Sequence, residues 1–279
     1  MMNFFSMFFS QRRVPVFVLL LFVTASISAQ CDARNAAFTA GERLTYQAYY
    51  NWHFIWVNGG EVLFKTDPIT YRQKPAMKLT ALAKTHKKYD VLLTIRDTFI
   101  AIIDTSRLEP LWSARSVKEG SYVANEYYRF DYDKKQIVTS LKVDKKPDRN
   151  LTVPMKECTM DLLTMVYKAR NIDFSKYRTS DKIPTRMIVD GVIHDLYITY
   201  LGKEIIKTKD QNRTFRCIKF KPMLMKGTLF DAGEDMTVWV TDDANRIPVM
   251  VEAKITIGSV KAILFDAKGL RHPITAEVK

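Results

Sequence analysis

Two long stretches of alternating apolar residues constrain the fold of this chain more than any other feature. From Ile247 to Ile257 every odd position is apolar. Because side chains alternate between the two faces of a strand, such a pattern predicts β-strands with one apolar face. The other stretch covers residues 44–56 and is either one bent strand or two strands joined by a tight turn. Its even positions are all apolar or aromatic: Leu44, Tyr46, Ala48, Tyr50, Trp52, Phe54 and Trp56.

Shorter alternating segments fill most of the remaining chain. Turn residues such as Gly59-Gly60 and Asp242-Asp243 separate them. Several short strands at regular spacing predict an antiparallel meander. We expect further strands near 61–66, 76–86, 97–104, 111–118, 121–132, 136–143, 186–190, 192–200, 203–208, 215–221, 235–241 and 260–265.

Helical patterning is scarce. The best case is about 160–170, where Leu162, Leu163 and Val166 share one helical face and Thr159 is a candidate N-cap. Long strands with a one-sided apolar face must twist and coil. The sequence therefore predicts a mainly β fold, a curved antiparallel sheet or half-open barrel with one packed helix.

The N-terminal segment has the three parts of a secretory signal peptide. Arg12 and Arg13 precede the apolar stretch 14–25, and the small residues of 26–29 follow it. We expect cleavage after Ala29, or one residue earlier, which leaves a single β-rich domain over 30–279. The alternative is an uncleaved anchor, although the apolar core is shorter than a spanning helix needs. No later segment reaches membrane length, so the mature chain is expected to have no transmembrane segment and to be exported, in the periplasm or associated with the outer membrane.

The chain is strongly basic, with 43 Lys and Arg against 30 Asp and Glu and a net charge of +13. For an exported protein this charge does not indicate nucleic acid as the partner. The anions of an envelope are lipid headgroups and acidic glycans, and an envelope lipid or an anionic glycan is the expected partner class. The alternative is an ordinary solvated surface, because the lysines are scattered in pairs such as Lys87-Lys88. No motif identifies a protein partner.

The three cysteines allow one disulfide in an oxidising compartment. Cys217 lies within an alternating segment and is expected to be a buried, free thiol. Cys31 and Cys158 lie outside regular strands, so we expect them to form the disulfide. Gln30 stands where a lipid-attachment signal needs a small residue, so no lipid is expected on Cys31.

No catalytic or cofactor motif is present. The chain has no nucleophile elbow, phosphate loop, dinucleotide fingerprint or His-Glu-x-x-His pattern, and its four histidines are far apart. The acidic residues between Asp231 and Asp243 match no calcium loop spacing. Asp97, which follows Arg96 and lies between the apolar residues Ile95 and Phe99, is expected to be the buried partner of a basic residue. We therefore expect no catalytic residue, no cofactor and no metal.

Aromatic side chains are the best candidates for ligand binding. Tyr and Trp suit the wall of a pocket that is apolar inside and wet at its rim. The alternative is a filled core, as in small barrels. The predicted wall on the concave face consists of Tyr46, Tyr50, Trp52, Phe54, Trp56 and Trp239.

Several short segments also share their residues with a known family. They are 38–46, Trp56 with Gly59-Gly60, 96–99 with Asp104, 108–110, 118–120, 236–243 and 246–248. These segments resemble an exported Gram-negative envelope family of unknown function, family 3108 among the domains of unknown function. The resemblance implies a shape similar to that of lipoprotein carriers, which hold acyl chains in a half-open β-barrel under a helical lid. It supplies no catalytic residues.

Taken together, these features predict a non-catalytic periplasmic or cell-envelope binding protein that holds a lipidic or amphiphilic ligand on the concave face of its sheet. The alternative is a structural or assembly partner of envelope polysaccharide or outer-membrane machinery. An enzyme is the third class, and a carboxylate and a histidine in one cleft would favour it.

Overall fold

The computed structural model describes residues 34–52, 55–91, 94–208, 211–224, 236–255 and 258–278. The expected signal peptide, Cys31 and Phe54 lie outside these residues. The described chain contains one α-helix, α1 (Leu162–Ala169), and two short 3-10 helices, η2 (Lys87–Tyr89) and η3 (Phe174–Lys176). Its strands are β1 (Arg43–Trp52), β2 (Ile55–Tyr71), β3 (Lys74–Thr85), β4 (Arg96–Asp104), β5 (Pro110–Glu119), β6 (Tyr122–Asp131), β7 (Gln136–Val143), β8 (Arg149–Pro154), β9 (Lys182–Val189), β10 (Val192–Thr208), β11 (Arg213–Pro222), β12 (Met236–Thr241), β13 (Pro248–Lys254), β14 (Ser259–Lys268) and β15 (Glu277–Val278).

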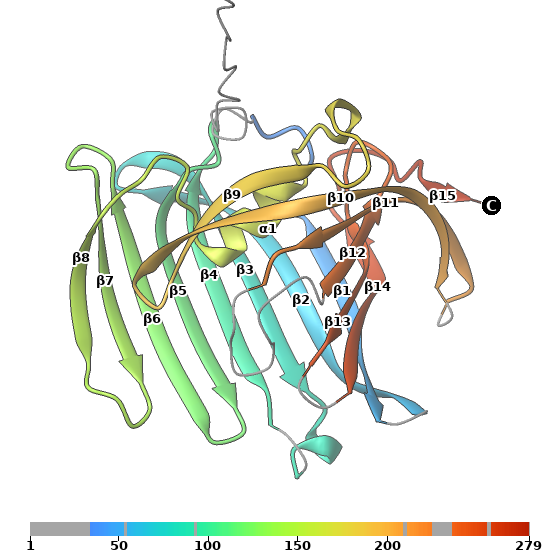
Figure 1. Cartoon of the computed structure of the whole chain (residues 1–279), viewed down its shortest axis with the longest axis horizontal. Helices are drawn as coiled ribbons and strands as arrows, with labels where there is room; N and C mark the ends of the chain where they lie inside the picture. The colour runs from blue at the N-terminus through green and yellow to red at the C-terminus, as the bar shows by residue number, and fades with distance from the viewer. Residues whose placement is uncertain are drawn as a thin grey trace, which may run out of the picture.

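All of these strands belong to one antiparallel sheet. Its order is β8-β7-β6-β5-β4-β3-β2-β1-β14-β13-β12-β11-β10-β9, and β15 pairs with β11. The sheet is therefore two meanders, β1 to β8 and β9 to β14, joined where β1 pairs with β14. It curls so that β9 and β10 cross in front of the upper halves of the opposite strands (Figure 1). The predicted fold class, a mainly β curved sheet or half-open barrel with one helix, is confirmed.

Helix α1 lies inside the curl, between β3 and β4 on one side and β9 on the other (Figure 1). Leu163 and Tyr167 pack against Leu79, Ala101 and Ile103 of the sheet. The helix begins after Asp161, whose carboxylate accepts hydrogen bonds from the backbone N–H groups of Leu163 (3.0 Å) and Thr164 (3.1 Å). Asp161, and not Thr159, is therefore the N-cap, because only its side chain reaches the unpaired N–H groups of the first turn.

The two outermost strands of the sheet, β8 and β9, do not pair with each other in the described chain. Side-chain packing holds the two ends of the sheet together instead, because Ile188 and Ile193 of the β9–β10 hairpin contact Tyr128, Ile137 and Leu141 of β6 and β7. The curl is thus completed by a docked hairpin rather than by a closed hydrogen-bonded barrel.

Gly191 lies at the turn of this docked hairpin. Its φ is +77°, and an added Cβ would lie 2.8 Å from Leu151 Cδ1 and 3.1 Å from Leu141 Cδ1. The backbone N–H of Gly191 donates to the Tyr128 hydroxyl (3.3 Å), and that of Asp190 donates to Glu126 (3.4 Å). Glycine suits this position because its φ is positive and because an added Cβ would have to displace the ends of the Leu151 and Leu141 side chains.

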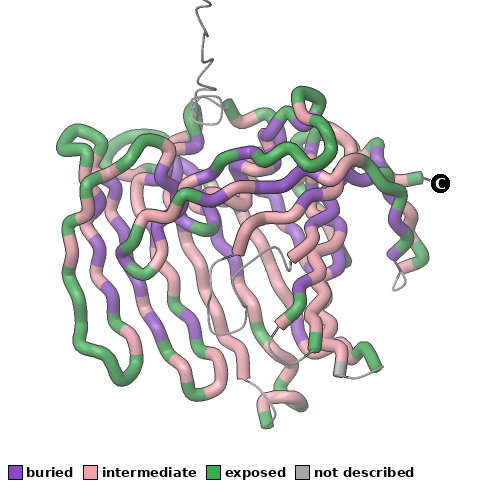
Figure 2. The backbone as a smooth tube through the Cα atoms, viewed as in Figure 1, coloured by how far each residue is buried: buried purple, intermediate pink, exposed green. Residues whose placement is uncertain are grey.

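Buried and exposed positions follow this architecture (Figure 2). The main apolar cluster surrounds α1 in the upper half of the curl, and a second cluster of β9 to β12 packs on Ile172 and Phe174, which follow the helix. Within the described residues, no helix is both long and apolar enough to span a bilayer.

Candidate functional site

The concave face of the sheet is defined by cross-strand pairing. One row of paired residues runs from the apolar side of the curl to a polar side: Leu44, Phe64, Ala81, Phe99, Arg115, Glu126, Leu141 and Arg149. Phe64, Ala81 and Phe99 belong to the cluster around α1, so this row faces the inside of the curl. Paired residues in an antiparallel sheet share a face, which identifies every other concave position from the same register.

Tyr46 and Tyr50 lie on this concave face, but they differ in burial. Tyr46 is 2% exposed and packs with Leu44, Ile247 and Leu264, and its ring centroid lies 5.7 Å from that of Phe64. Tyr46 is therefore a core residue. Tyr50 pairs with Val57 and Val260 and is half-buried. The Trp52 backbone pairs with Ile55, and Phe54 lies outside the described residues.

Trp56 lies on the opposite, convex face, so the prediction that it shares a face with Tyr46 is wrong. Trp56 pairs with Asn51, a neighbour of the concave residue Tyr50, and Lys261 Nζ lies 4.3 Å from the Trp56 ring centroid. The cause is a reversal of only two residues between β1 and β2. In such a hairpin the even positions of β1 pair with odd positions of β2, and paired residues share a face. The even position Trp56 therefore lies on the opposite face from the even positions of β1.

Trp239 also faces away from the concave side, so its predicted place in the concave wall is wrong. Its neighbours Val238 and Val240 pack into the interior cluster with Phe174. Trp239 packs instead with Phe215, Cys217 and Val249, and its indole N–H donates to Glu204 (3.1 Å). Alternation along β12 thus sends the Trp239 side chain to the convex face, under Lys219.

Below the level of α1, the concave face is lined by half-buried apolar side chains. The lower halves of β1 to β6 are not crossed by α1, β9 or β10 (Figure 1). Here the pairing of β1 to β3 with β13 and β14 places small and apolar residues of both meanders next to one another. The half-buried members are Ala48, Tyr50, Val57, Val62, Ala83, Val251, Val260 and Ala262.

A polar cluster borders this apolar strip on β4 to β6. Arg115 forms an ion pair with the buried Glu126, which also accepts a 2.5 Å hydrogen bond from the Tyr128 hydroxyl. Asp97, which pairs with the concave residue Ala83, accepts a hydrogen bond from the Lys118 backbone N–H (3.1 Å). Burial, with a smaller contribution from Glu119, raises the pKa of Asp97 to about 6.

The sequence did not identify this polar cluster, because its members come from three separate strands. The one signal was Asp97 between the apolar residues Ile95 and Phe99. The expected ion pair of Asp97 is not among the ion pairs of the described residues, and a backbone N–H takes that place. The positive charge of Arg115 also lowers the pKa of Asp97, but by less than the hydrogen bond from the Lys118 backbone does.

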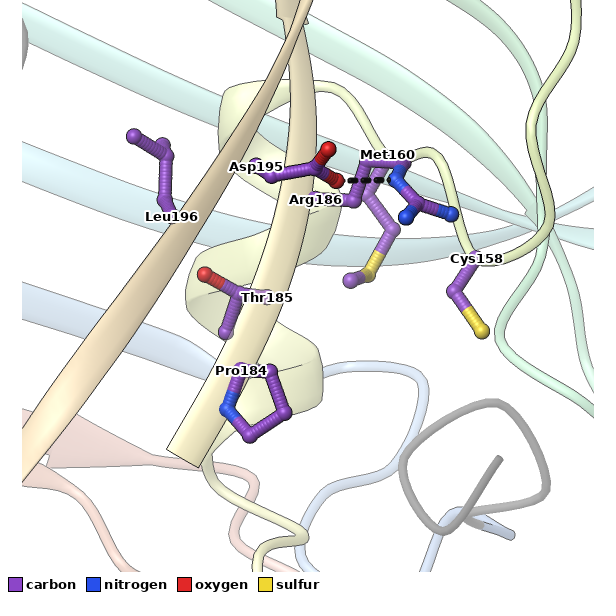
Figure 3. A pocket seen from close by; sticks show the side chains of 7 residues that line it. All are labelled: Cys158, Met160, Pro184, Thr185, Arg186, Asp195 and Leu196. Carbon is purple, nitrogen blue, oxygen red and sulfur yellow. Dashed lines mark hydrogen bonds and ion pairs between the residues drawn. The ribbon is translucent and has the colours of Figure 1, made fainter. Parts of the chain in front are cut away.

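A separate pocket of about 260 Å³ lies beside Cys158, between the segment before α1 and the β9–β10 hairpin (Figure 3). Its lining residues are Cys158, Met160, Pro184, Thr185, Arg186, Asp195 and Leu196. Arg186 closes one side through hydrogen bonds to Asp195 (2.5 Å) and to the Glu157 carbonyl (2.6 Å). None of the predicted aromatic residues lines this pocket.

Three of the segments that carry the family resemblance, 38–46, 236–243 and 246–248, meet near the end of α1. Glu42 accepts two hydrogen bonds from Arg170 (2.6 and 2.8 Å), and Arg170 Nε donates to the Asn245 carbonyl (3.1 Å). Asp243 accepts hydrogen bonds from the Thr241 hydroxyl, from the backbone N–H groups of Asn245 and Arg246, and from those of Thr275 and Ala276. Together with Arg170 and Asn245, the residues of these segments fix the β1 start, the helix end and the β12–β13 turn to one another.

Comparison with protein families covers all of these segments except residues 38–44. The model of a family described as protein of unknown function, DUF3108, matches residues 45–264. The chain belongs to the DUF3108 family. The family description names no activity, so membership establishes no reaction or ligand for this DUF3108 protein.

A solved structure shares the fold of this DUF3108 member. It is a β-barrel-like protein of the domain of unknown function DUF1849 from Brucella abortus, with a TM-score of 0.53 and 7% sequence identity. The likeness covers 84% of this chain and 99% of that one, and at this identity it concerns the fold alone. The comparison with curated proteins found no match.

Proposed function

We propose that this DUF3108 protein is a non-catalytic binding protein of the cell envelope that holds the acyl chain of an amphiphilic ligand on its concave face. The observation that carries the proposal is the strip of half-buried apolar side chains below α1, from Ala48 and Tyr50 to Ala83. Apolar area left in water costs about 25 cal/mol per Å². An acyl chain lying along this strip would remove that cost.

The polar cluster supports an amphiphile rather than a purely apolar ligand. Asp97 and Arg115 lie beside the apolar strip on β4 and β5, so one end of a ligand in the strip is within reach of charged groups. Pockets for such ligands are mostly apolar with a few polar groups that fix orientation. The expected signal peptide supports a place in the envelope, where lipids are available.

Displacement of a fluorescent fatty acid tests the proposal with a matched pair of variants. Ala83 is half-buried on the concave face, and its neighbour Lys84 is exposed on the convex face. Ala83→Phe should fill the strip and weaken binding by about tenfold or more, because the acyl chain loses several buried methylene contacts. Lys84→Phe adds the same ring on the other face and should leave binding unchanged.

Two outcomes would contradict the proposal. The first is no measurable binding of the fatty acid by the wild-type protein. The second is equal loss of binding in both variants, provided that their circular dichroism spectra match that of wild type, since binding would then not depend on the concave face.

A further inference from the structure

Two of the most exposed apolar side chains of the molecule lie at one end of the sheet. Val91 is 87% exposed and Ile55 is 68% exposed, and the adjacent Trp56 is 38% exposed. Ile55 and Trp56 begin β2, and Val91 follows η2 between β3 and β4. Figure 1 shows both strand connections at the lower end of the molecule, opposite to the level of α1. We call this surface, with Lys87, Lys88 and Lys254, the η2 end.

Cross-strand pairing brings the two hairpins of this end together. The His86 backbone N–H donates to the Gly59 carbonyl (2.8 Å), and the His86 ring lies 3.1 Å from Asn58 Oδ1. The start of η2 is thereby fixed to β2, three residues from Ile55. On the convex face, Trp56 pairs with Asn51, Asn51 with Ser259, and Ser259 with Lys254, so Lys254 lies in the same row as Trp56.

The charge of the η2 end is positive after its ion pairs are counted. Glu61 pairs with Lys84 (3.3 Å), Asp90 with Arg96 (2.6 Å) and Glu252 with Lys261 (3.3 Å). Lys87, Lys88 and Lys254 are exposed, and none of them has an ion pair among the described residues. Three lysines are therefore in excess beside the three exposed apolar side chains.

Exposed apolar residues on strand connections, flanked by lysines, have the composition of a surface that sits on anionic lipid. Apolar side chains enter the boundary between headgroups and acyl chains, while lysines remain at the level of the phosphates. We propose that the η2 end docks this protein onto an anionic lipid surface. A protein partner fits less well, because Ile55 and Trp56 come from the start of β2 and Val91 from the β3–β4 connection, and three side chains are too few for a patch of interface size.

The docking site would also explain how a ligand reaches the strip. The η2 end lies at the lower end of the concave face, next to the part that α1 does not cover (Figure 1). Docking there would bring the strip close to the lipid surface that supplies or receives the amphiphile. This last point rests on the proposed function, whereas docking itself does not.

Co-sedimentation with vesicles tests the proposal, using the protein without its expected signal peptide, which retains every described residue. Wild type should bind phosphatidylglycerol vesicles and not phosphatidylcholine vesicles, and binding should weaken with added salt. Lys87→Gln with Lys88→Gln should weaken it roughly twenty-five-fold, since each lysine near an anionic surface contributes about fivefold. Ile55→Ser with Val91→Ser should weaken it by about tenfold or more through lost insertion.

Matched controls come from the same chain. Lys134 and Lys135 form an exposed pair at the β6–β7 turn, at the opposite end of the sheet, and Ile205 on β10 is 66% exposed. Lys134→Gln with Lys135→Gln, and Ile205→Ser, should bind vesicles as wild type does. Equal losses in control and test variants, or no binding of wild type to anionic vesicles, would overturn the proposal, and in the second case a protein would be the better candidate partner. Fatty acid displacement should be unchanged in Lys87→Gln with Lys88→Gln, whose side chains lie on η2 outside the strip, so that failure of docking and failure of ligand binding are distinguishable.

Discussion

Arg170 at the end of α1 and Glu42 at the start of β1 form a bidentate ion pair in the interior of the molecule. The two hydrogen bonds measure 2.6 and 2.8 Å, and the side chains are 2% and 0% exposed. The guanidinium also lies over the rings of Phe38 and Tyr167, at 5.3 and 5.6 Å from their centroids. This pair anchors α1 to β1, the strand through which the two meanders are joined.

Removal of either partner should strongly destabilise the fold. Glu42→Gln or Arg170→Met leaves one buried charge without its counter-ion, which costs about 3–5 kcal/mol. The double variant Glu42→Leu with Arg170→Met removes both charges and should recover a large part of that loss. Urea unfolding measures the free energy of unfolding of each protein. A loss below about 1 kcal/mol in both single variants, the range of an exposed pair, would contradict the role of this pair as an anchor.

Much of the sheet was predictable from local alternation, and the failures have a common cause. Strand β7 has the predicted limits, 136–143, because its alternating apolar face is packed on one side. The face of Trp56 was not predictable, because a two-residue reversal and the bulge near Gly59 change which parity of β2 points inwards. The face of Trp239 depends on the pairing of β12 with β13, which the local pattern does not give. Local alternation predicts that a segment forms a strand. It does not predict the pairing register, which decides which of the two faces points into the curl.

Other differences follow from position in the sheet. Strand β8 was not predicted, because as an edge strand with Pro154 and two half-buried apolar residues it has only a weak pattern. The segments 192–200 and 203–208 form one strand, β10, with an irregularity at Leu201. The polar cluster of the candidate site could not be predicted, since Glu126 and Asp190 are brought together only by docking of the β9–β10 hairpin.

The docked hairpin predicts a specific sensitivity at Gly191. Gly191→Ala places a Cβ 2.8 Å from Leu151 Cδ1 and adds strain at a φ of +77°. Gly41→Ala is the matched control, because Gly41 has a φ of +94° and no atom within 4 Å of the added Cβ. We expect Gly41→Ala to cost about 1 kcal/mol from backbone strain and Gly191→Ala to cost roughly 1–3 kcal/mol more from overpacking.

Hydrogen exchange separates hairpin undocking from global unfolding in this pair of variants. In Gly191→Ala the amides of β9 and β10 near the turn should exchange faster, while those of β2 and β3 should change only with global stability. Equal exchange profiles for the two variants would show that Gly191 is needed for its φ alone and that its contact with Leu151 is unimportant.

The raised pKa of Asp97 predicts a pH dependence of stability. Its carboxyl group has a pKa of about 6 in the folded protein against an ordinary value of 3.8, chiefly because of burial. The folded state therefore holds its proton more tightly than the unfolded state does, and this contribution to stability falls as the pH rises from about 4 to 6. Asp97→Asn removes the titrating group, so the variant should gain stability relative to wild type over that range.

Asp104, at the other end of β4, supplies a control of opposite sign. Burial alone would raise its pKa, but hydrogen bonds from the Arg107 and Ser106 backbone and from the Ser106 hydroxyl lower it overall. The lowered pKa means that the Asp104 carboxylate stabilises the fold at a pH above the ordinary value of 3.8 and no longer does so in acid. Asp104→Asn should therefore be less stable than wild type above that pH, and the difference should shrink as the pH falls. Urea unfolding at several pH values measures both differences, and a flat difference for Asp97→Asn would contradict its raised pKa.

The cysteines give a last prediction, on the redox state of the protein. Cys217 is a free thiol, 0% exposed, and burial raises its pKa to about 12. A thiol that is both inaccessible and protonated should not react with iodoacetamide until the protein is unfolded.

Because Cys217 is free and buried, we expect Cys158 to bond to Cys31, which lies outside the described residues. The bond would tie the mature N-terminus to the segment before α1 and, by closing a long loop, should stabilise the fold by about 4 kcal/mol. Peptide mapping without reduction should recover residues around Cys31 and Cys158 as one linked peptide, and Cys158→Ser should expose a second thiol to iodoacetamide in the folded protein. Recovery of Cys217 in the linked peptide would show that the pairing is wrong.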